Sequence, residues 1–329
     1  LVTHDHELSN IEYDHLLLAT GCQERSIPFP GWQLPGVMLL GAIQLQLKSG
    51  LVRPGNKVVI TGSGPLLVLV ACQLHKAGCQ VEAIYEAAKF SSVAKETLAM
   101  LNRPQQALDG LSMMWYLKQH NIPLHYGWGL VKAEGVRQLN EVTVAPYDDN
   151  WFPDHSQAVT HVVDTLGVGY GFAARSQLAQ LIGLDIEYDH MSGAIPAVDK
   201  WQRSSQENIF CAGDSAKIAG ADAAMLEGKI AAKAIACELG KLGSADAEQY
   251  IAAMRRKLSR LYRFRQAFDN AGFRELGLLS LPEEDTVICR CEQVKKKVID
   301  EAIAQGCRDI VTLKMRTRVT MGDCQGKTC

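Results

Sequence analysis

A strand, a glycine-rich loop, a helix and a second strand follow one another without interruption between residues 57 and 86, and this succession constrains the fold most. Lys57–Thr61 is a run of β-branched residues, which is typical of a buried parallel strand. Gly62-Ser63-Gly64-Pro65-Leu66-Leu67 follows, then a helix to about residue 75, and Gln80–Tyr85 is the second predicted strand. This order predicts an α/β fold with a dinucleotide site.

Each part of the glycine loop has a predicted role. Gly62 permits the tight turn, and Gly64 lets the backbone reach a pyrophosphate at the helix N-terminus. Glu86 stands where an acid accepts a hydrogen bond from a ribose 2′-OH and disfavours NADP. Leu67 replaces the third glycine of the fingerprint, so an ordinary βαβ unit with nothing bound is the alternative. The candidate nucleotide-binding residues are Gly62, Ser63, Gly64, Pro65, Leu66 and Glu86.

A second candidate site lies at the end of the predicted strand Ile209–Ala212. Open α/β sheets bind ligands at the carboxyl ends of their strands. Asp214 can accept hydrogen bonds from the ribityl hydroxyls of a flavin, and the alanine-rich helix predicted over 222–239 would direct its N-terminal dipole at the flavin pyrimidine. A solvated Gly-Asp turn is the alternative. The candidate FAD residues lie on this turn and at an earlier strand end: Thr20, Gly21, Gly213 and Asp214.

Other segments have weaker patterns. Lys95–Gly110 and Ser112–Asn121 are predicted helices, Gly129–Val144 an antiparallel hairpin and Val159–Leu166 a single returning strand. Ser244–Gly277 is predicted to be a helical, basic spacer.

The last forty-odd residues contain cysteines in two pairs, Cys289-Arg290-Cys291 and the Cys324 to Cys329 segment. Four thiolates suit a [2Fe–2S] cluster, and from residue 286 onward nine Lys/Arg against five Asp/Glu can offset its negative charge. Zinc usually uses Cys-x₂₋₄-Cys spacing, which Cys-x-Cys fits poorly. A disulfide, or four unrelated core cysteines, would also account for the pattern. The candidate metal ligands are Cys289, Cys291, Cys324 and Cys329.

Composition limits the range of functions. A chain of 329 residues is long enough for two domains and a small appendage, and a formal net charge of −2 does not indicate nucleic acid or an anionic membrane as partner. No apolar stretch reaches the length of a membrane span. Ten cysteines and the lack of a leader in this sequence favour the cytoplasm, with partner proteins as the route to the inner membrane. The first residue is not Met, so we expect a fragment of a longer chain.

Taken together, these motifs resemble the flavin-binding alpha-type subunits of the opine oxidase, D-hydroxyproline dehydrogenase and hydrogen cyanide synthase family, over nearly the whole chain. The matching motifs are Leu18-Ala19-Thr20-Gly21 with Glu24-Arg25, Pro28-Phe29-Pro30-Gly31-Trp32, Gly62 to Leu67, Ala212-Gly213-Asp214, Cys289-Arg290-Cys291-Glu292, and Met321-Gly322 to Cys329. The combination is specific to this group, whereas each motif alone is not.

The resemblance implies an α/β flavoprotein of the disulfide-reductase type with two dinucleotide-binding domains, N-terminally truncated because the family's first FAD loop would precede Leu1. It also implies a small α-rich [2Fe–2S] module like bacterioferritin-associated ferredoxin. The implied parts are an FAD-domain remnant (1–36), an NAD(P)-binding-type domain (37–165), the second FAD part (166–242), a helical linker (243–285) and the cluster domain (286–329).

The activity implied by the resemblance is that of an FAD-dependent oxidoreductase subunit. It would pass electrons between FAD and the cluster, while a second flavin-containing subunit oxidises a small amine, opine or imino acid. NAD is a further expected ligand, with its role as reactant or inert ligand left open. A self-sufficient NAD(P)H-dependent reductase and a non-catalytic scaffold that holds a cluster are the competing interpretations. The sequence nominates no catalytic acid or base.

Overall fold

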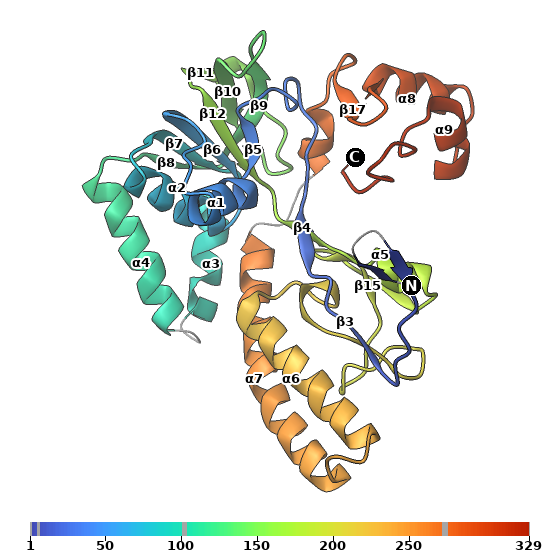
Figure 1. The fold of residues 1–329 in the computed structure, drawn as a ribbon. Coiled ribbons are helices and arrows are strands. Elements are labelled where there is room, and N and C mark those ends of the chain that lie inside the picture. The colour runs from blue at the N-terminus through green and yellow to red at the C-terminus, as the bar shows by residue number, and fades with distance from the viewer. Residues whose placement is uncertain (1, 5–6, 101–103, 272–275, 329) are drawn as a thin grey trace. The chain divides into compact units, whose positions relative to one another are not determined.

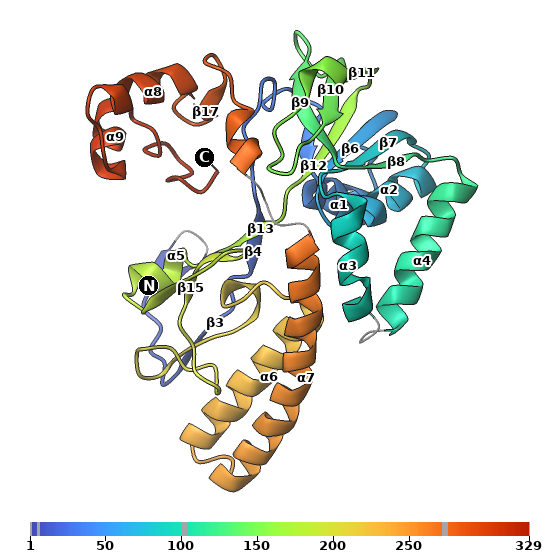
Figure 2. The same cartoon turned by 180° about the vertical axis from the view of Figure 1, so that it is seen from behind.

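The computed structural model describes residues 2–4, 7–100, 104–271 and 276–328. The chain divides into two compact units, each made of two separate stretches (Figure 1 and Figure 2). Unit 1 comprises Leu1–Gln23 and Phe172–Gln266, and unit 2 comprises Glu24–Gly171 and Ala267–Cys329. The domain boundaries expected from the sequence stay predictions. Within the described stretches, no helix has the length and apolar composition needed to cross a membrane.

Unit 2 is built on a parallel sheet with strand order β5-β12-β6-β7-β8. Its strands are β5 (Val37–Leu39), β6 (Lys57–Gly62), β7 (Gln80–Glu86), β8 (Leu124–Tyr126) and β12 (Thr165–Gly169). All residues of β6 after its first are buried, as a central parallel strand requires. Helix α2 (Leu66–Lys76) connects β6 to β7, so the strand, loop, helix and strand predicted from the sequence are confirmed.

Helices pack on one face of this sheet and an antiparallel sheet packs on the other. Val58 and Ile60 of β6 join a core with α1 (Leu40–Ser49) and α2, whereas Val59 points to the opposite face and joins a core with Leu130. This alternation follows from the two-residue period of a strand. The antiparallel sheet comprises β9 (Trp128–Glu134), β10 (Glu141–Pro146) and β11 (Val159–Val162).

The prediction of one strand over Val159–Leu166 is wrong. The segment divides into β11, which pairs antiparallel with β10, and β12, which pairs parallel with β6. Between them, Asp164 accepts hydrogen bonds from the backbone amides of Asn56 and Lys57 at 3.0 and 3.1 Å. These bonds turn the chain from one sheet into the other, and no local sequence pattern records such a long-range contact.

The helix boundaries predicted over residues 95–121 are also wrong. The observed helices are α3 (Phe90–Met100) and α4 (Pro104–Gln119), so the expected break after Gly110 does not exist. Pro104 is the first residue of α4, where the missing N–H of proline costs no helical hydrogen bond. Gly110 in the helix interior is tolerated at a cost of about 1 kcal/mol.

In unit 1 a parallel strand pair carries the candidate flavin residues. Strand β16 (Ile209–Cys211) pairs with β3 (Leu16–Leu18). The helix expected over 222–239 is α6 (Ala221–Glu238), and it packs beside α7 (Ser244–Ala271) through a core that includes Ile230 and Leu258 (Figure 1). The remaining elements are β1 (Val2–His4), β2 (Glu7–Ser9), β4 (Cys22–Glu24), β13 (Phe172–Ala174), α5 (Gln177–Leu181), β14 (Ile186–Asp189) and β15 (Gly193–Pro196).

The described C-terminal segment belongs to unit 2. A 3-10 helix at Leu276–Ser280 precedes it, and Leu278 packs in the same core as Trp151. Gly277 lies so close to this core that an added Cβ would stand 2.1 Å from the carbonyl carbon of Trp151. The elements that follow are β17 (Val287–Cys289), β18 (Val294–Lys295), α8 (Lys296–Ala304) and α9 (Ile310–Thr317).

Candidate functional site

The glycine loop of unit 2 begins where β6 passes close to β12. Gly62 has φ +149°, and an added Cβ would stand 2.0 Å from the carbonyl oxygen of Gly169. The amide of Ser63 donates to that same oxygen at 2.8 Å. Only glycine lets the two strands approach this closely at the point where the loop leaves the sheet.

Glu86 lies against the loop, because β7 ends beside β6. Its carboxylate accepts hydrogen bonds from the amide of Gly64 at 2.8 Å and from the amide of Ala88 at 3.0 Å. The side chain is buried, and burial raises its pKa although the backbone hydrogen bonds act in the opposite direction. The structure therefore brings Gly64 and Glu86 together, and it pairs the loop amide with a carboxyl group of the same domain.

The rest of the loop forms the start of α2. Pro65 occupies the N-cap position without a side-chain capping bond, and Leu66 is the first helical residue. An added Cβ at Gly64 would meet no heavy atom of the described residues within 4 Å. The loop thus presents open space above an uncapped helix N-terminus, which is the geometry that binds anions.

In unit 1 the register of β3 and β16 places both parts of the predicted flavin site at one sheet edge. Leu18 pairs with Cys211, and the amide of Ala212 donates to the carbonyl of Leu18 at 3.0 Å. The Thr20 hydroxyl donates to the carbonyl of Arg175 at 2.6 Å, which fixes the segment after β3. The four predicted flavin residues therefore follow the carboxyl ends of two neighbouring parallel strands.

Asp214 organises the turn that leads into α6. One carboxylate oxygen accepts from the amides of Ala219 and Gly220 at 3.2 and 3.4 Å, and the other accepts from the Cys22 thiol at 3.4 Å. Helix α6 begins without a side-chain cap. Added Cβ atoms at Gly21 and Gly220 would meet no heavy atom of the described residues within 4 Å. The backbone is therefore open at both glycines.

Sequence reasoning missed Glu227, a fully buried acid on α6 that accepts a hydrogen bond from the amide of Gly213 at 2.7 Å. Its signal is a charged residue on an otherwise apolar helix face, between Ala223 and Ile230, which are also fully buried. It missed Cys22 as well, because its contact with Asp214 joins residues 192 positions apart.

Of the predicted cysteine ligands near the C-terminus, the structure places Cys291 and Cys324 beside each other. Cys289 is fully buried, and Cys291 is exposed. The side chains of Cys291 and Cys324 lie close enough to influence each other's pKa, although the residues are 33 positions apart in the chain. A backbone hydrogen bond from Thr328 is the first of the causes that lower the pKa of Cys324 to about 6.

A close backbone approach makes this pairing possible. An added Cβ at Gly322 would stand 2.3 Å from the Cβ of Cys291. The fourth predicted ligand, Cys329, lies outside the described residues. In the part of the chain that the structure describes, no group of three or more His, Cys, Asp or Glu side chains is arranged to hold a metal ion.

Trp32, in the predicted Pro30-Gly31-Trp32 motif, anchors the first strand of this segment. Its indole N–H donates to the carbonyl of Val287 at 2.7 Å, two residues before Cys289. Gly31 has φ +84°, and an added Cβ would stand 1.9 Å from the carbonyl oxygen of Ala133. Because residue 31 is a glycine, the Pro30-Gly31-Trp32 segment can pack against β9, and the Trp32 side chain then contacts β17.

Replacing Trp32 with phenylalanine is expected to loosen β17. The change removes the donor but keeps an aromatic ring, and a lost hydrogen bond of this kind costs about 1 kcal/mol. We expect about fivefold faster amide hydrogen exchange over residues 287–295, measured by mass spectrometry. Trp115→Phe, at an exposed position on α4, is the matched control. Unchanged exchange in Trp32→Phe would contradict the anchoring role.

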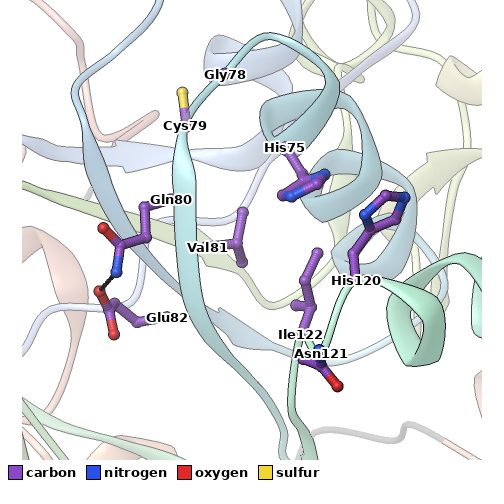
Figure 3. Close-up of a pocket in the computed structure, with 9 residues that line it drawn as sticks. All are labelled: His75, Gly78, Cys79, Gln80, Val81, Glu82, His120, Asn121 and Ile122. Atoms are coloured by element: carbon purple, nitrogen blue, oxygen red, sulfur yellow. Dashed lines mark hydrogen bonds between the residues drawn. The ribbon is translucent and has the colours of Figure 1, made fainter.

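A pocket of about 500 Å³ lies at the other end of β7, near its first residue (Figure 3). His75 and His120 both line the pocket, and their ring centroids are 4.6 Å apart. His75 Nδ1 lies 2.9 Å from the Tyr116 hydroxyl. The predicted site residues are not among those that line it. The pocket is separate from the glycine loop, which follows the opposite end of the neighbouring strand.

Comparison with known proteins agrees with the α/β fold. Residues 2–228 match the pyridine nucleotide-disulphide oxidoreductase family. Hydrogen cyanide synthase subunit HcnB of Pseudomonas protegens is 50% identical over 329 residues, which cover 100% of this chain and 70% of that protein. An opine oxidase subunit of Rhizobium meliloti is 32% identical over 331 residues, covering 97% of this chain and 60% of that protein.

Among solved structures, L-proline dehydrogenase from P. horikoshii has a TM-score of 0.63 at 22% identity. The match covers 96% of this chain and 51% of the other, so this chain spans about half the length of that protein. At this identity the likeness concerns the fold alone. By its family match and its relation to HcnB and opine oxidase subunits, the chain belongs to the pyridine nucleotide-disulphide oxidoreductase family and is an FAD-dependent oxidoreductase.

Proposed function

We propose that the chain is the electron-transferring subunit of a heteromeric dehydrogenase for a small amine, opine or imino acid. It would hold FAD at the turn that contains Asp214 and a [2Fe–2S] cluster at four cysteines. The observation that carries the proposal is that the side chains of Cys291 and Cys324 lie together, although the two residues are far apart in the chain. The proposed cluster ligands are Cys289, Cys291, Cys324 and Cys329.

Three features of the described cysteines support a cluster. Cys289 is buried beside Val294 and Val319, so one side of the site is apolar, while Cys291 is exposed on the other. The low pKa of Cys324 favours a thiolate, which is the form that binds a metal. Exposure on one side leaves a route for electrons to a partner protein.

The chemistry of the residues at the turn in unit 1 also fits FAD. The Asp214 carboxylate lies at the sheet edge with acceptor capacity for ribityl hydroxyls. The uncapped N-terminus of α6 would stabilise negative charge on the ring. When bound, FAD accepts an electron pair and the cluster carries single electrons, while the protein contributes position and electrostatics.

The relatives support a multisubunit enzyme. HcnB is named as a subunit of hydrogen cyanide synthase, and the Rhizobium meliloti relative is named as a subunit of opine oxidase. We infer that this chain also works with a second, flavin-containing subunit that oxidises the amine or imino acid. The cytoplasm is the proposed location, and the five domains expected from the sequence are the proposed division of the chain.

An NAD(P)H-dependent reductase is the second candidate, because the open loop at Gly64 favours an anion. In that case Glu86 would accept from the ribose, as its position in the fingerprint predicts. The Gly64 amide already donates to Glu86, however, so a pyrophosphate would have to compete with a carboxyl group for that donor. This competition favours the electron-transfer subunit.

The absorption spectrum of the full-length protein, with iron and sulfide assays, tests the proposal. We expect flavin bands, a broad visible shoulder and about two irons per chain. Bleaching of the flavin by an amine only when the partner subunit is present supports the proposal. Rapid bleaching by NADH alone supports the second candidate, and protein purified intact without flavin would indicate a non-catalytic scaffold.

Replacing Asp214 with alanine is expected to weaken FAD binding by about 10- to 100-fold, because hydrogen bonds to a charged group contribute about 1.5–3 kcal/mol. The dissociation constant follows from flavin fluorescence quenching during titration of the apoprotein. Asp246→Ala, at an exposed position on α7, should bind FAD like the unmodified protein. Equal affinity of both variants would remove Asp214 from the flavin site.

A further inference from the structure

Glu227 is a fully buried acid on α6, the helix whose apolar face packs against α7. One carboxylate oxygen accepts the amide hydrogen of Gly213 at 2.7 Å, and the other accepts the hydroxyl hydrogen of Tyr262 at 2.5 Å. Both partners donate, so the carboxylate is the natural acceptor for each. Removing it would leave two buried donors without a partner, which is costly.

The first of these bonds acts on the predicted flavin turn. Gly213 has φ +77°, and the 3-10 turn Gly213–Ser215 begins one residue after the end of strand β16, with Ala212 between them. At this point the chain leaves the sheet, so the Gly213 amide has lost the strand pairing that satisfies its neighbours. Glu227 replaces that pairing and thereby sets the backbone from which the Asp214 side chain extends.

The second bond comes from α7, which packs beside α6 in both views (Figure 1 and Figure 2). Tyr262 stands on this helix, and the ammonium group of Lys217 lies 4.8 Å from its ring centroid. Lys217 lies three residues after Asp214 in the chain. Tyr262 therefore contacts Glu227 through its hydroxyl and Lys217 through its ring.

The family match ends at residue 228, before α7 begins. We propose that Glu227 is a positioning residue that holds the Gly213–Asp214 turn in its FAD-binding geometry, and that Tyr262 of α7 holds Glu227 in place. The flavin affinity of this chain then depends on a helix outside the matched family region. The inference rests on the proposed function, since it requires FAD at this turn.

The network also responds to pH. Burial is the largest cause that raises the pKa of Glu227 to about 7, and Asp214 raises it further. The hydrogen bonds from Tyr262 and Gly213 and the charge of Lys217 act in the opposite direction. The ionised carboxylate accepts from both donors, so FAD affinity should fall as the pH drops through about 7. Replacing Glu227 with glutamine should flatten this dependence, because glutamine does not titrate.

The test uses the full-length protein with Glu227→Gln and Tyr262→Phe. Tyr250→Phe is the matched control, because this tyrosine lies on the same helix beneath Lys233 and is 52% exposed. The FAD dissociation constant is measured by fluorescence from pH 5.5 to 8.5. We expect both test variants to bind about tenfold more weakly at pH 8, which corresponds to the loss of one hydrogen bond.

The pH profile separates positioning from general damage. In Tyr262→Phe the carboxylate loses a donor, so the midpoint of the affinity profile should move to higher pH. In the control variant it should stay near that of the unmodified protein. Unchanged affinity and midpoint in Tyr262→Phe, or an unaltered profile in Glu227→Gln, would overturn the inference while leaving the proposed function standing. An unmodified protein that binds no FAD would overturn both.

Discussion

Cys291→Ser is expected to abolish the iron–sulfur absorption and to reduce bound iron from about two per chain to near zero, while FAD binding stays nearly intact. A serine hydroxyl is a harder, far less acidic ligand than a thiolate and binds iron poorly in such sites. The exposed Cys291 contacts Cys324, so its loss also removes the thiol donor that helps to stabilise the Cys324 thiolate. Iron, sulfide and visible absorption of the full-length protein measure the effect.

Cys237→Ser is the control for this substitution, because Cys237 is a partly exposed free thiol on α6 and is not a proposed ligand. It should retain the full iron content and spectrum. Folding of Cys291→Ser is checked through its circular dichroism and FAD affinity, which report on the rest of the chain. A normal cluster in Cys291→Ser would contradict the ligand assignment, whereas loss in both variants would indicate general instability.

Gly62→Ala is expected to destabilise unit 2 by about 3–4 kcal/mol, a large share of the 5–15 kcal/mol that stabilises an ordinary domain. The new Cβ would stand 2.0 Å from the carbonyl oxygen of Gly169 and 2.5 Å from its carbonyl carbon. Both are backbone atoms of the neighbouring central strand, so neither can move aside without opening the sheet between β6 and β12. The φ of +149° adds strain for any L side chain.

Gly64→Ala is the matched comparison in the same loop. Its φ of +105° costs about 1–2 kcal/mol, but an added Cβ meets open space. We expect urea unfolding, followed by circular dichroism, to rank the two variants in this order. Nucleotide affinity should fall in Gly64→Ala even where stability permits binding, because the methyl group fills the space proposed for a pyrophosphate. Equal destabilisation by both substitutions would contradict the close packing at Gly62.

Much of unit 2 could be predicted because its signals are local. The run at Lys57–Thr61 and the helix after it are correct to within a residue or two, since burial and backbone bonding in a central strand impose composition on consecutive residues. The predicted boundaries of the helices in residues 95–121 were wrong, because a break was expected after Gly110 and α4 continues through it. A glycine weakens a helix without ending it when packing on both sides continues.

The candidate sites divide in the same way. Residue type and spacing nominated Gly64, Asp214 and Cys291, because each belongs to a short motif. Other residues support these sites through contacts that no motif indicates. Glu227, Tyr262 and Trp32 act through contacts that cross 14, 35 and 255 positions of the chain.

The nucleotide-type α/β unit, the glycine-aspartate turn and the cysteine-rich tail can all be recognised from the order of the amino acids alone. The folded chain was needed to show that the Gly64 amide donates to Glu86, that Glu227 accepts hydrogen bonds from Gly213 and from Tyr262 of α7, and that the side chains of Cys291 and Cys324 lie together. These two kinds of feature depend on contacts of different range along the chain. Strand and helix periodicity arises from neighbours along the chain, whereas the partner of a buried donor or thiol is set by the closure of long loops and by the packing of the whole unit.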